Sequence, residues 1–284
     1  MSGERILVPT DLSEFSVAAL KYAAMLRGPL RAAMTVVYAD EPGYPTSMPD
    51  LPMAVRERPP GEKPLVLETM RRHVEKHIPP PAPELRSAFG FAAQVIATTA
   101  EEIDATLIVM GTHGRRGFRR LMLGSVTESV LRETLRSLLT LGPGAIAEQP
   151  AQVRTILCPV NFSFVALDAM RRAATFASCL EAELVVLYVA EEKQPPLTEE
   201  LERELDTWVA PELRGRSRYR QMIAAGNAAE RVLEIADQVG AGLLVIGAQH
   251  RRFRSATVIG TTTERLVRFA GCAVLTVPRG AQGS

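Results

Sequence analysis

Ala105-Thr-Leu-Ile-Val-Met-Gly-Thr-His-Gly114, followed after nine residues by Gly124-Ser-Val-Thr-Glu-Ser-Val130, is the stretch that decides how this chain folds. Its apolar first part predicts a buried strand, and its last part predicts a helix. Ser125 and Glu128 have the spacing of a capping box, with Ser125 as the N-cap. The glycines between strand and helix lack a Cβ atom, so the backbone can turn with positive φ or approach a ligand closely. The pattern predicts a strand, a glycine-bearing loop and a helix.

The start of this helix is a candidate anion site. Backbone N–H groups of a first helical turn and the positive end of the helix dipole attract phosphate. The loop adds positive charge through four arginines, Arg115, Arg116, Arg119 and Arg120. Strand-to-helix turns also carry glycine without binding anything, so the local pattern leaves an ordinary turn as the alternative.

Composition narrows the class of protein. The chain has 284 residues, of which 46% are hydrophobic, and its formal net charge is +1. This gives no global field for nucleic acid or an anionic membrane, and we expect neither as a partner. Three distant cysteines argue against a disulfide framework. With no visible signal peptide, and no apolar stretch near the ~20 residues that span a bilayer, we expect a cytoplasmic protein.

The chain contains a long-period repeat. Arg5-Ile-Leu-Val-Pro-Thr-Asp-Leu-Ser13 matches Thr155-Ile-Leu-Cys-Pro-Val-Asn-Phe-Ser163, and Leu107-Ile-Val-Met-Gly111 matches Leu243-Leu-Val-Ile-Gly247. Gly124-Ser-Val-Thr-Glu128 likewise matches Gly260-Thr-Thr-Thr-Glu264. Because the matches keep their order, the sequence predicts two homologous domains, residues 1–146 and 151–284, joined near residues 144–152.

Each copy alternates strands with helices. In the first copy we expect strands at 5–9, 31–39, 84–89, 107–111 and 137–141, and helices from about 13, at 65–78, at 91–103 and from 125. The first helix shows Phe15, Ala19, Tyr22 and Leu26 at helical spacing, and the second shows Val66, Met70, Val74 and Ile78. Residues 40–64, with seven prolines, are expected to be an irregular loop. In the second copy we expect strands at 155–160, 183–190, 217–224, 243–247 and 273–278, and a helix capped by Thr198.

This alternation predicts an α/β fold, with two tandem doubly wound domains. Each would have a five-stranded parallel sheet of order 3-2-1-4-5 and helices on both faces. Ligands of such sheets bind at the carboxyl ends of the strands, where the strand order reverses. Asp11 follows the first strand and Gly111 ends the fourth, so both segments should meet in one crevice.

These residues resemble the universal stress protein family, over nearly the whole chain. Gly111, Gly114, Gly124 and Ser125 match the family's nucleotide pattern G-x2-G-x9-G-[ST], and Pro9-Thr-Asp11-x-Ser13 resembles its ligand-contacting Asp segment. The resemblance implies ATP, with or without Mg²⁺, as the cofactor. The implied ligand-binding residues are Pro9, Thr10, Asp11, Ala39, Met110, Gly111, Gly114, Arg115, Gly124, Ser125 and Val126.

The second copy departs from this pattern. His250 stands where the first copy has Gly114, and Asn161 stands where it has Asp11. A histidine would strain the turn or obstruct the phosphate, and an asparagine loses an acceptor for ribose hydroxyls. We therefore expect a degenerate nucleotide site in the second domain, although Arg251, Arg252 and Arg254 leave weak anion binding open.

Other signals carry weaker hypotheses. His73 and His77 have a metal-compatible spacing without an accompanying cluster of carboxylates or cysteines, so we expect no metal site. His113 could contact phosphate or carry a proton, but a solvent-facing loop residue is the simpler interpretation. Cys158 is expected to be a small buried residue. The long proline-rich loop is either a lid or partner surface, or a loop without function.

The functional hypothesis is an ATP-binding stress-response regulator without a dedicated enzymatic activity. The chain lacks a P-loop lysine and an obvious water-activating residue, so we expect slow hydrolysis at most. The alternatives are a nucleotide-dependent transferase or hydrolase on the same fold, and a scaffold that binds no nucleotide. Partners would be ATP and an unidentified regulatory protein. The resemblance also suggests that the fifth strands, 137–141 and 273–278, pair in a homodimer or within the chain as a pseudo-dimer.

Overall fold

A computed structural model describes residues 3–41, 62–112, 123–147, 152–190, 199–248, 251–253, 256–258 and 260–280. The first half consists of β1 Arg5–Thr10, α1 Glu14–Arg27, β2 Ala33–Asp40, α2 Glu62–His77, β3 Glu84–Phe89, α3 Ala92–Glu102, β4 Leu107–Gly111, α4 Ser125–Glu133, β5 Ser137–Leu141 and α5 Pro143–Ala147. The second half consists of β6 Thr155–Val160, α6 Phe164–Leu180, β7 Glu183–Ala190, α7 Glu199–Leu213, β8 Tyr219–Ala225, α8 Ala228–Gln238, β9 Leu243–Ala248, β10 Arg251–Phe253, β11 Ala256–Val258, α9 Thr261–Phe269 and β12 Ala273–Pro278.

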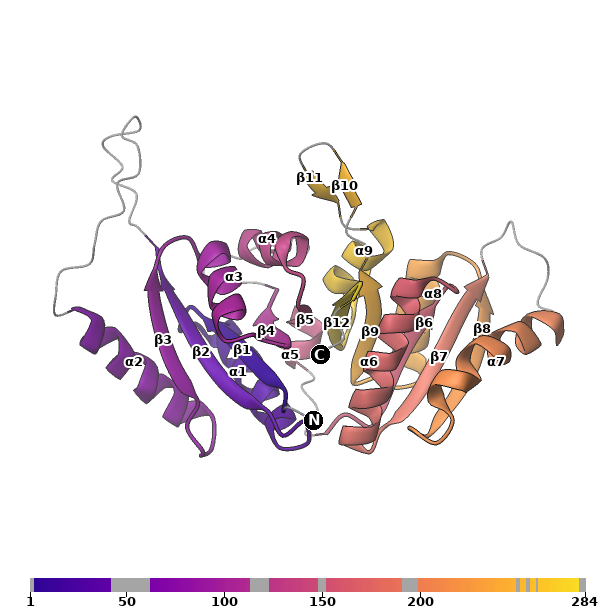
Figure 1. The fold of residues 1–284 in the computed structure, drawn as a ribbon, viewed down its shortest axis with the longest axis horizontal. Coiled ribbons are helices and arrows are strands. Elements are labelled where there is room, and N and C mark those ends of the chain that lie inside the picture. Colours follow the sequence, from indigo (N-terminus) through magenta and orange to yellow (C-terminus); the bar gives the residue numbers. More distant parts are fainter. Residues whose placement is uncertain are drawn as a thin grey trace.

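Ten strands form one sheet that runs through both halves, in the order β3-β2-β1-β4-β5-β12-β9-β6-β7-β8 (Figure 1). Read from its outer edge toward the centre, each half has the order 3-2-1-4-5 that the sequence predicts. Neighbouring strands are parallel except β5 and β12, which pair antiparallel with Leu139 opposite Leu275. The expected pairing of the fifth strands therefore occurs within one chain, and each covers the other's edge.

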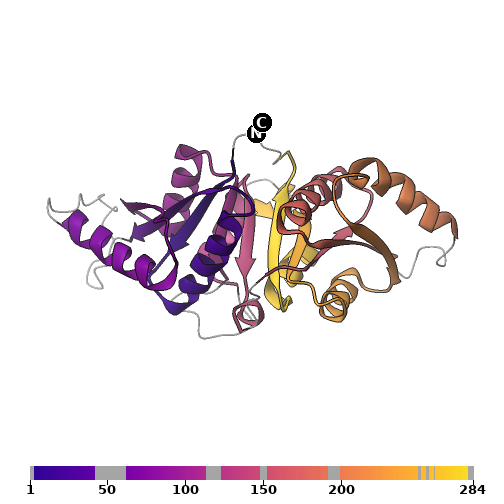
Figure 2. The same cartoon turned by 90° about the horizontal axis from the view of Figure 1, so that it is seen from below.

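Helices cover both faces of this sheet (Figure 2). Side chains of α1, α2, α5, α6 and α7 share one apolar core, and those of α3, α4, α8 and α9 share the other. Strand residues alternate between the two cores: Ile6 and Val8 lie in the first, and Leu7 lies in the second. Burial on both faces explains why these strands read as continuous apolar runs.

The structure corrects several details of the expected elements. Phe15 is exposed, so the buried stripe of α1 consists of Ala19, Tyr22 and Leu26 without it. Helix α2 already begins at Glu62, within the stretch expected to be irregular. The hairpin of β10 and β11 was not expected, because three-residue strands leave almost no periodic signal. Residues 42–61, and Thr198 with its expected cap, lie outside the described residues.

Side chains outside the β5–β12 pair also make polar contacts from one half to the other. Arg172 of α6 forms an ion pair with Glu4, with Nη2 at 2.8 Å from Oε2. The Glu4 side chain also accepts a hydrogen bond from the Thr106 hydroxyl. On α1, the Tyr22 hydroxyl donates to the Gly242 carbonyl at 3.2 Å. Together with the β5–β12 pair, these contacts join the two halves at the amino ends of β1, β4 and β9.

Candidate functional site

The candidate site lies where β1 and β4 end side by side. The two strands pair in parallel, with Leu7 opposite Ile108, so their carboxyl ends open at the same edge of the sheet. Strand β2 lies on the other side of β1, with Tyr38 opposite Thr10. Ala39 therefore follows directly beyond the end of β1. The structure brings these segments together as expected for a doubly wound sheet.

The β1–α1 turn is held by a dense set of hydrogen bonds. Asp11 Oδ1 accepts from the Ser13 backbone N–H at 3.0 Å and from the Ser13 hydroxyl. Thr10 Oγ1 lies 3.0 Å from Ser16 Oγ, and Ser13 caps the helix by accepting from the Ser16 N–H. Between them, Leu12 adopts a left-handed φ of 62°. Residues other than glycine rarely adopt this conformation, and backbone strain of this kind clusters at functional sites.

Thr112 closes the base of the glycine-bearing loop. It is buried, and its backbone N–H donates to the Leu141 carbonyl at 2.9 Å. Its own carbonyl accepts from the Gly124 N–H at 2.8 Å, so both ends of the loop meet at this residue. The first turn of α4 is tied to the same place, because the Thr127 hydroxyl donates to the Gly111 carbonyl at 2.9 Å. Strand end and helix start are thus held together independently of residues 113–122.

The start of α4 differs from the capping box that the sequence predicts. The N-cap is Gly124, which has no side chain to cap the helix, and Ser125 is the first helical residue. Glu128 forms an ion pair with Arg132 at 2.6 Å instead of reaching back to the cap. The capping-box prediction was wrong because the helix begins one residue earlier, which makes Gly124 the N-cap and Glu128 the fourth helical residue. An uncapped first turn leaves N–H groups without a partner inside the helix, which is what an anion site requires.

The other ligand-binding residues expected from the sequence have different surroundings. Val126 is partly buried and packs against the core beneath α4. Met110 is buried in the same core, so only its backbone can face the crevice. Pro9 is half-buried within β1. Gly114, Arg115 and His113 lie outside the described residues.

The equivalent turn in the second half keeps its shape and loses its charge. Asn161 Oδ1 accepts from the Ser163 hydroxyl at 2.7 Å, and Ser163 caps α6. Phe162 has a left-handed φ of 56°, as Leu12 does in the first half. Because an asparagine holds this turn, the negative charge of Asp11 is not required for the fold.

The first glycine of the motif has a packing role in the second half. A Cβ atom on Gly247 would lie 2.7 Å from the carbonyl oxygen of Val165 in α6. Only glycine lets β9 end this close to the start of the helix. Gly247 therefore does not by itself indicate a phosphate site. His250 lies outside the described residues, and β10 and β11 form a hairpin beyond the carboxyl edge of the sheet (Figure 1).

Other candidate sites find less support. No group of three or more metal-binding side chains occurs among the described residues. Cys158 is buried as expected, and burial raises the pKa of its thiol to about 12. A hollow of about 560 Å³ lies at the amino ends of β6, β7 and β8, away from the crevice. No helix in the described ranges is long and apolar enough to cross a membrane.

The sequence analysis did not predict that Thr112 and Thr127 hold the two sides of the site together. Both are buried threonines whose hydroxyls donate to backbone carbonyls. Thr127 carries a weak signal, since a buried hydroxyl in a first helical turn needs a nearby acceptor. Thr112 carries none, because its partner Leu141 is 29 residues away in sequence.

Comparison with known proteins agrees with this architecture. A family model described as the universal stress protein family matches residues 3–140 and again 152–278. A universal stress protein of Methanocaldococcus jannaschii is 29% identical over 138 residues, which are 45% of this chain and 76% of that protein. The crystal structure of a universal stress protein from Archaeoglobus fulgidus covers 99% of this chain and is itself covered completely, with a TM-score of 0.72 at 21% identity.

A shorter universal stress protein, whose structure was determined in complex with cAMP, is 21% identical and covers 50% of this chain and 98% of its own, with a TM-score of 0.37. The two matches of the family model coincide with the two halves of the sheet. This chain therefore belongs to the universal stress protein family and carries two of its domains in tandem.

Proposed function

We propose that this protein is a stress-response regulator that binds ATP in its first half. The observation that carries the proposal is the convergence of Asp11, at the end of β1, with the uncapped first turn of α4 at the end of β4. A carboxylate suits ribose hydroxyls, and a helix start with a glycine N-cap suits phosphates. The family motif supports the same assignment, with Gly111, Gly124 and Ser125 at this crevice and Gly114 in the loop between them.

The second half is proposed to bind ATP weakly or not at all. Its turn carries Asn161 in place of the aspartate, and its glycine motif carries His250. The fold of the turn is the same in both halves, so the difference concerns the ligand and not stability. ATP would then act as a signal held by one half of the molecule, with slow hydrolysis at most.

Exchange of the turn residues tests the proposal. Asp11→Asn should lower the affinity for ATP about tenfold, because a charge-assisted hydrogen bond is lost, while stability stays unchanged. The structure justifies this variant, since Asn161 shows that an asparagine maintains the turn. Isothermal titration calorimetry of the full chain measures the affinity, and the thermal midpoint reports the fold.

Asn161→Asp is the matched control in the second half. It should leave both the affinity and the number of bound ATP molecules unchanged, because His250 still occupies the loop. Wild-type protein that binds no ATP would overturn the proposed function and favour a scaffold. Turnover of ATP that is lost in Asp11→Asn while binding persists would favour the enzymatic alternative.

A further inference from the structure

Helix α2 carries two histidines, His73 and His77, that lie one turn apart beside the buried residue Val74. Their ring centroids are 4.8 Å apart, and both side chains are half-buried. The Nε2 atom of His73 is shielded from solvent and has no hydrogen-bond partner within the described ranges. A proton added to this nitrogen would therefore place a positive charge where the described chain offers it no acceptor.

Charges of both signs surround the pair, two carboxylates and two lysines, so burial decides the direction. The charged groups that act on it come from α1, from the turn before α1 and from α2 itself: Asp11, Glu14, Lys21 and Lys76. Strand β3 also contacts α2, but its charged residues lie toward the other face, where Arg86 pairs with Glu102 of α3.

Burial is the first cause that holds the pKa of His73 below its ordinary value of 6.5, followed by His77 and Lys76, with Asp11 acting in the opposite direction. Burial, Lys76 and Lys21 lower the pKa of His77 in the same way, against Glu14. Both imidazoles are therefore neutral when α2 is docked at neutral pH.

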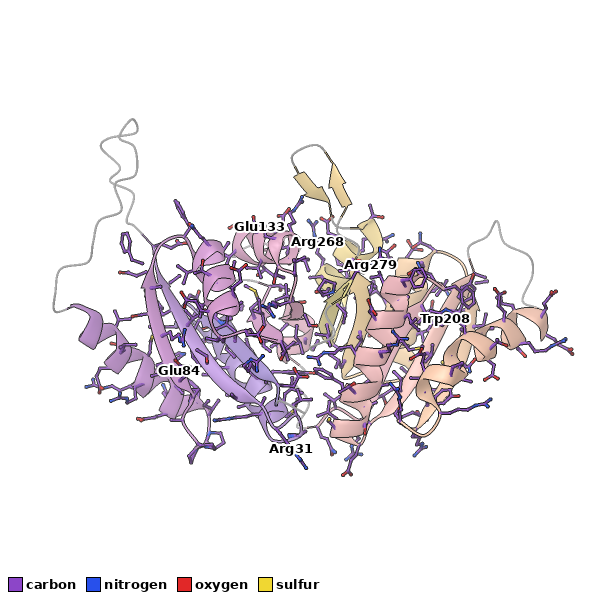
Figure 3. The ribbon with its side chains drawn as sticks, viewed as in Figure 1. Arg31, Glu84, Glu133, Trp208, Arg268 and Arg279 are labelled. Carbon is purple, nitrogen blue, oxygen red and sulfur yellow. The ribbon has the colours of Figure 1, made fainter. Side chains whose placement is uncertain are left out.

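The second half places an aromatic residue at the position of His73. Trp208 directly precedes the core residue Val209 of α7, as His73 directly precedes Val74 of α2. Figure 3 labels Trp208 on α7. Its ring packs edge-on against Phe162 with centroids 5.7 Å apart, and Phe162 packs against Tyr188 at 4.8 Å. An apolar contact thus fixes α7 to the β6–α6 turn.

The position of His77 also has a counterpart, which is Glu212. Its carboxylate accepts two hydrogen bonds from Arg171 of α6, at 2.6 and 2.8 Å. Arg171 follows the cap Ser163 by eight residues, as Lys21 follows the cap Ser13. Helices α6 and α7 thus attract each other through the opposite charges of Arg171 and Glu212. At the equivalent positions of α1 and α2, a lysine lies near a histidine.

We propose that the contact between α1 and α2 is a proton-sensitive joint, which loosens α2 from the first half on acidification while α7 stays fixed in the second half. Protonation would add charge beside Lys21 and Lys76 and at the Nε2 atom of His73, for which the described residues offer no acceptor. Because the joint borders the turn of Asp11, it would also regulate the ligand site, and this second part rests on the proposed function.

The sign follows from the direction of both pKa shifts. A docked α2 binds fewer protons than a released α2, because docking lowers the pKa of each histidine. The contribution of the two neutral histidines to docking is therefore fully present above about pH 7 and is lost as the pH falls below the ordinary histidine value of 6.5.

Hydrogen–deuterium exchange of the full chain without nucleotide tests the joint. After correction for intrinsic exchange, amide protection in α2 should fall about tenfold between about pH 7.5 and about pH 5.5, and that in α7 should stay constant. A double variant, His73→Gln with His77→Gln, should remove this dependence on pH. Equal protection of wild-type α2 at both pH values would overturn the proposal, as would an unchanged loss in the double variant.

ATP titrations at the same two pH values test the regulatory part. We expect affinity to fall on acidification in the wild type and to change less in the double variant. If the wild type exchanges as expected but binds ATP equally at both pH values, the proton-sensitive joint is supported and its regulatory role is overturned. If the wild type exchanges as expected but binds no ATP at either pH, the proton-sensitive joint is supported and the proposed function is overturned.

Discussion

The two halves share one backbone plan and differ in the chemistry of equivalent positions. The first half has Asp11 at its ligand turn and His73 on the neighbouring helix; the second half has Asn161 and Trp208 there. At these two positions the second half has an amide and an indole where the first half has a carboxylate and an imidazole. The two copies therefore keep one strand order while the side chains at equivalent positions differ in chemistry.

The asymmetry is reversed where the halves meet, because there the first half supplies the neutral side chain and the second half the charged one. Tyr22 and Arg172 each lie nine residues after the serine that caps their helix, so they occupy equivalent positions on α1 and α6. Each reaches across to the other half, but Tyr22 does so through one neutral hydrogen bond and Arg172 through an ion pair with Glu4. The two contacts should therefore differ both in strength and in their response to pH.

Removal of the charged contact should have the largest effect on stability. Arg172→Met leaves Glu4 without its main partner in a site where the two side chains are only 15% and 17% exposed. We expect the free energy of unfolding to fall by about 3 kcal/mol, as measured by urea denaturation. Arg171→Met is the matched control, because its partner Glu212 lies in the same half and the pair is more exposed. Equal losses in the two variants would contradict the importance of the crossing pair.

The crossing pair also predicts a pH dependence. Burial alone would raise the pKa of Glu4, but the hydrogen bond and charge of Arg172, with help from Thr106 and Arg5, hold it below its ordinary value of 4.5. A lowered carboxylate pKa contributes stability above the unfolded-state value, and this contribution is lost as the pH falls through the folded-state value. The stability difference between wild type and Arg172→Met should therefore shrink below about pH 4.5.

Gly247→Ala should have the next largest effect and tests the packing role of the motif's first glycine. The added Cβ atom would lie 2.7 Å from the Val165 carbonyl oxygen, and backbone cannot yield as a flexible side chain can. We expect a loss of about 2 kcal/mol in the free energy of unfolding. Gly28→Ala is the control, because nothing lies within 4 Å of its Cβ position. A stable Gly247→Ala variant would show that α6 can shift away from β9.

The comparison also shows what the sequence can predict. The repeat, the strand order and the start of a helix near Ser13 were predicted from the sequence, and the structure confirms them. The exposure of Phe15 and the glycine N-cap of α4 were not predicted. The spacing of the residues fits the predicted and the observed arrangement equally well. The Glu4–Arg172 pair joins residues 168 positions apart, so no local pattern could indicate it.

Tyr22→Phe should have the smallest effect and completes the comparison of the crossing contacts. It removes one neutral hydrogen bond to the Gly242 carbonyl, and we expect a loss of about 1 kcal/mol in urea denaturation. Burial raises the pKa of the Tyr22 phenol, so the hydroxyl stays protonated and donates throughout the accessible pH range. The contribution of the Tyr22 hydrogen bond to stability should therefore be constant from about pH 4 to about pH 9, whereas the contribution of the Arg172 ion pair is lost in acid. A Tyr22 effect that disappears in acid together with the Arg172 effect would mean that the two contacts open as one unit, and that the two halves separate before either unfolds.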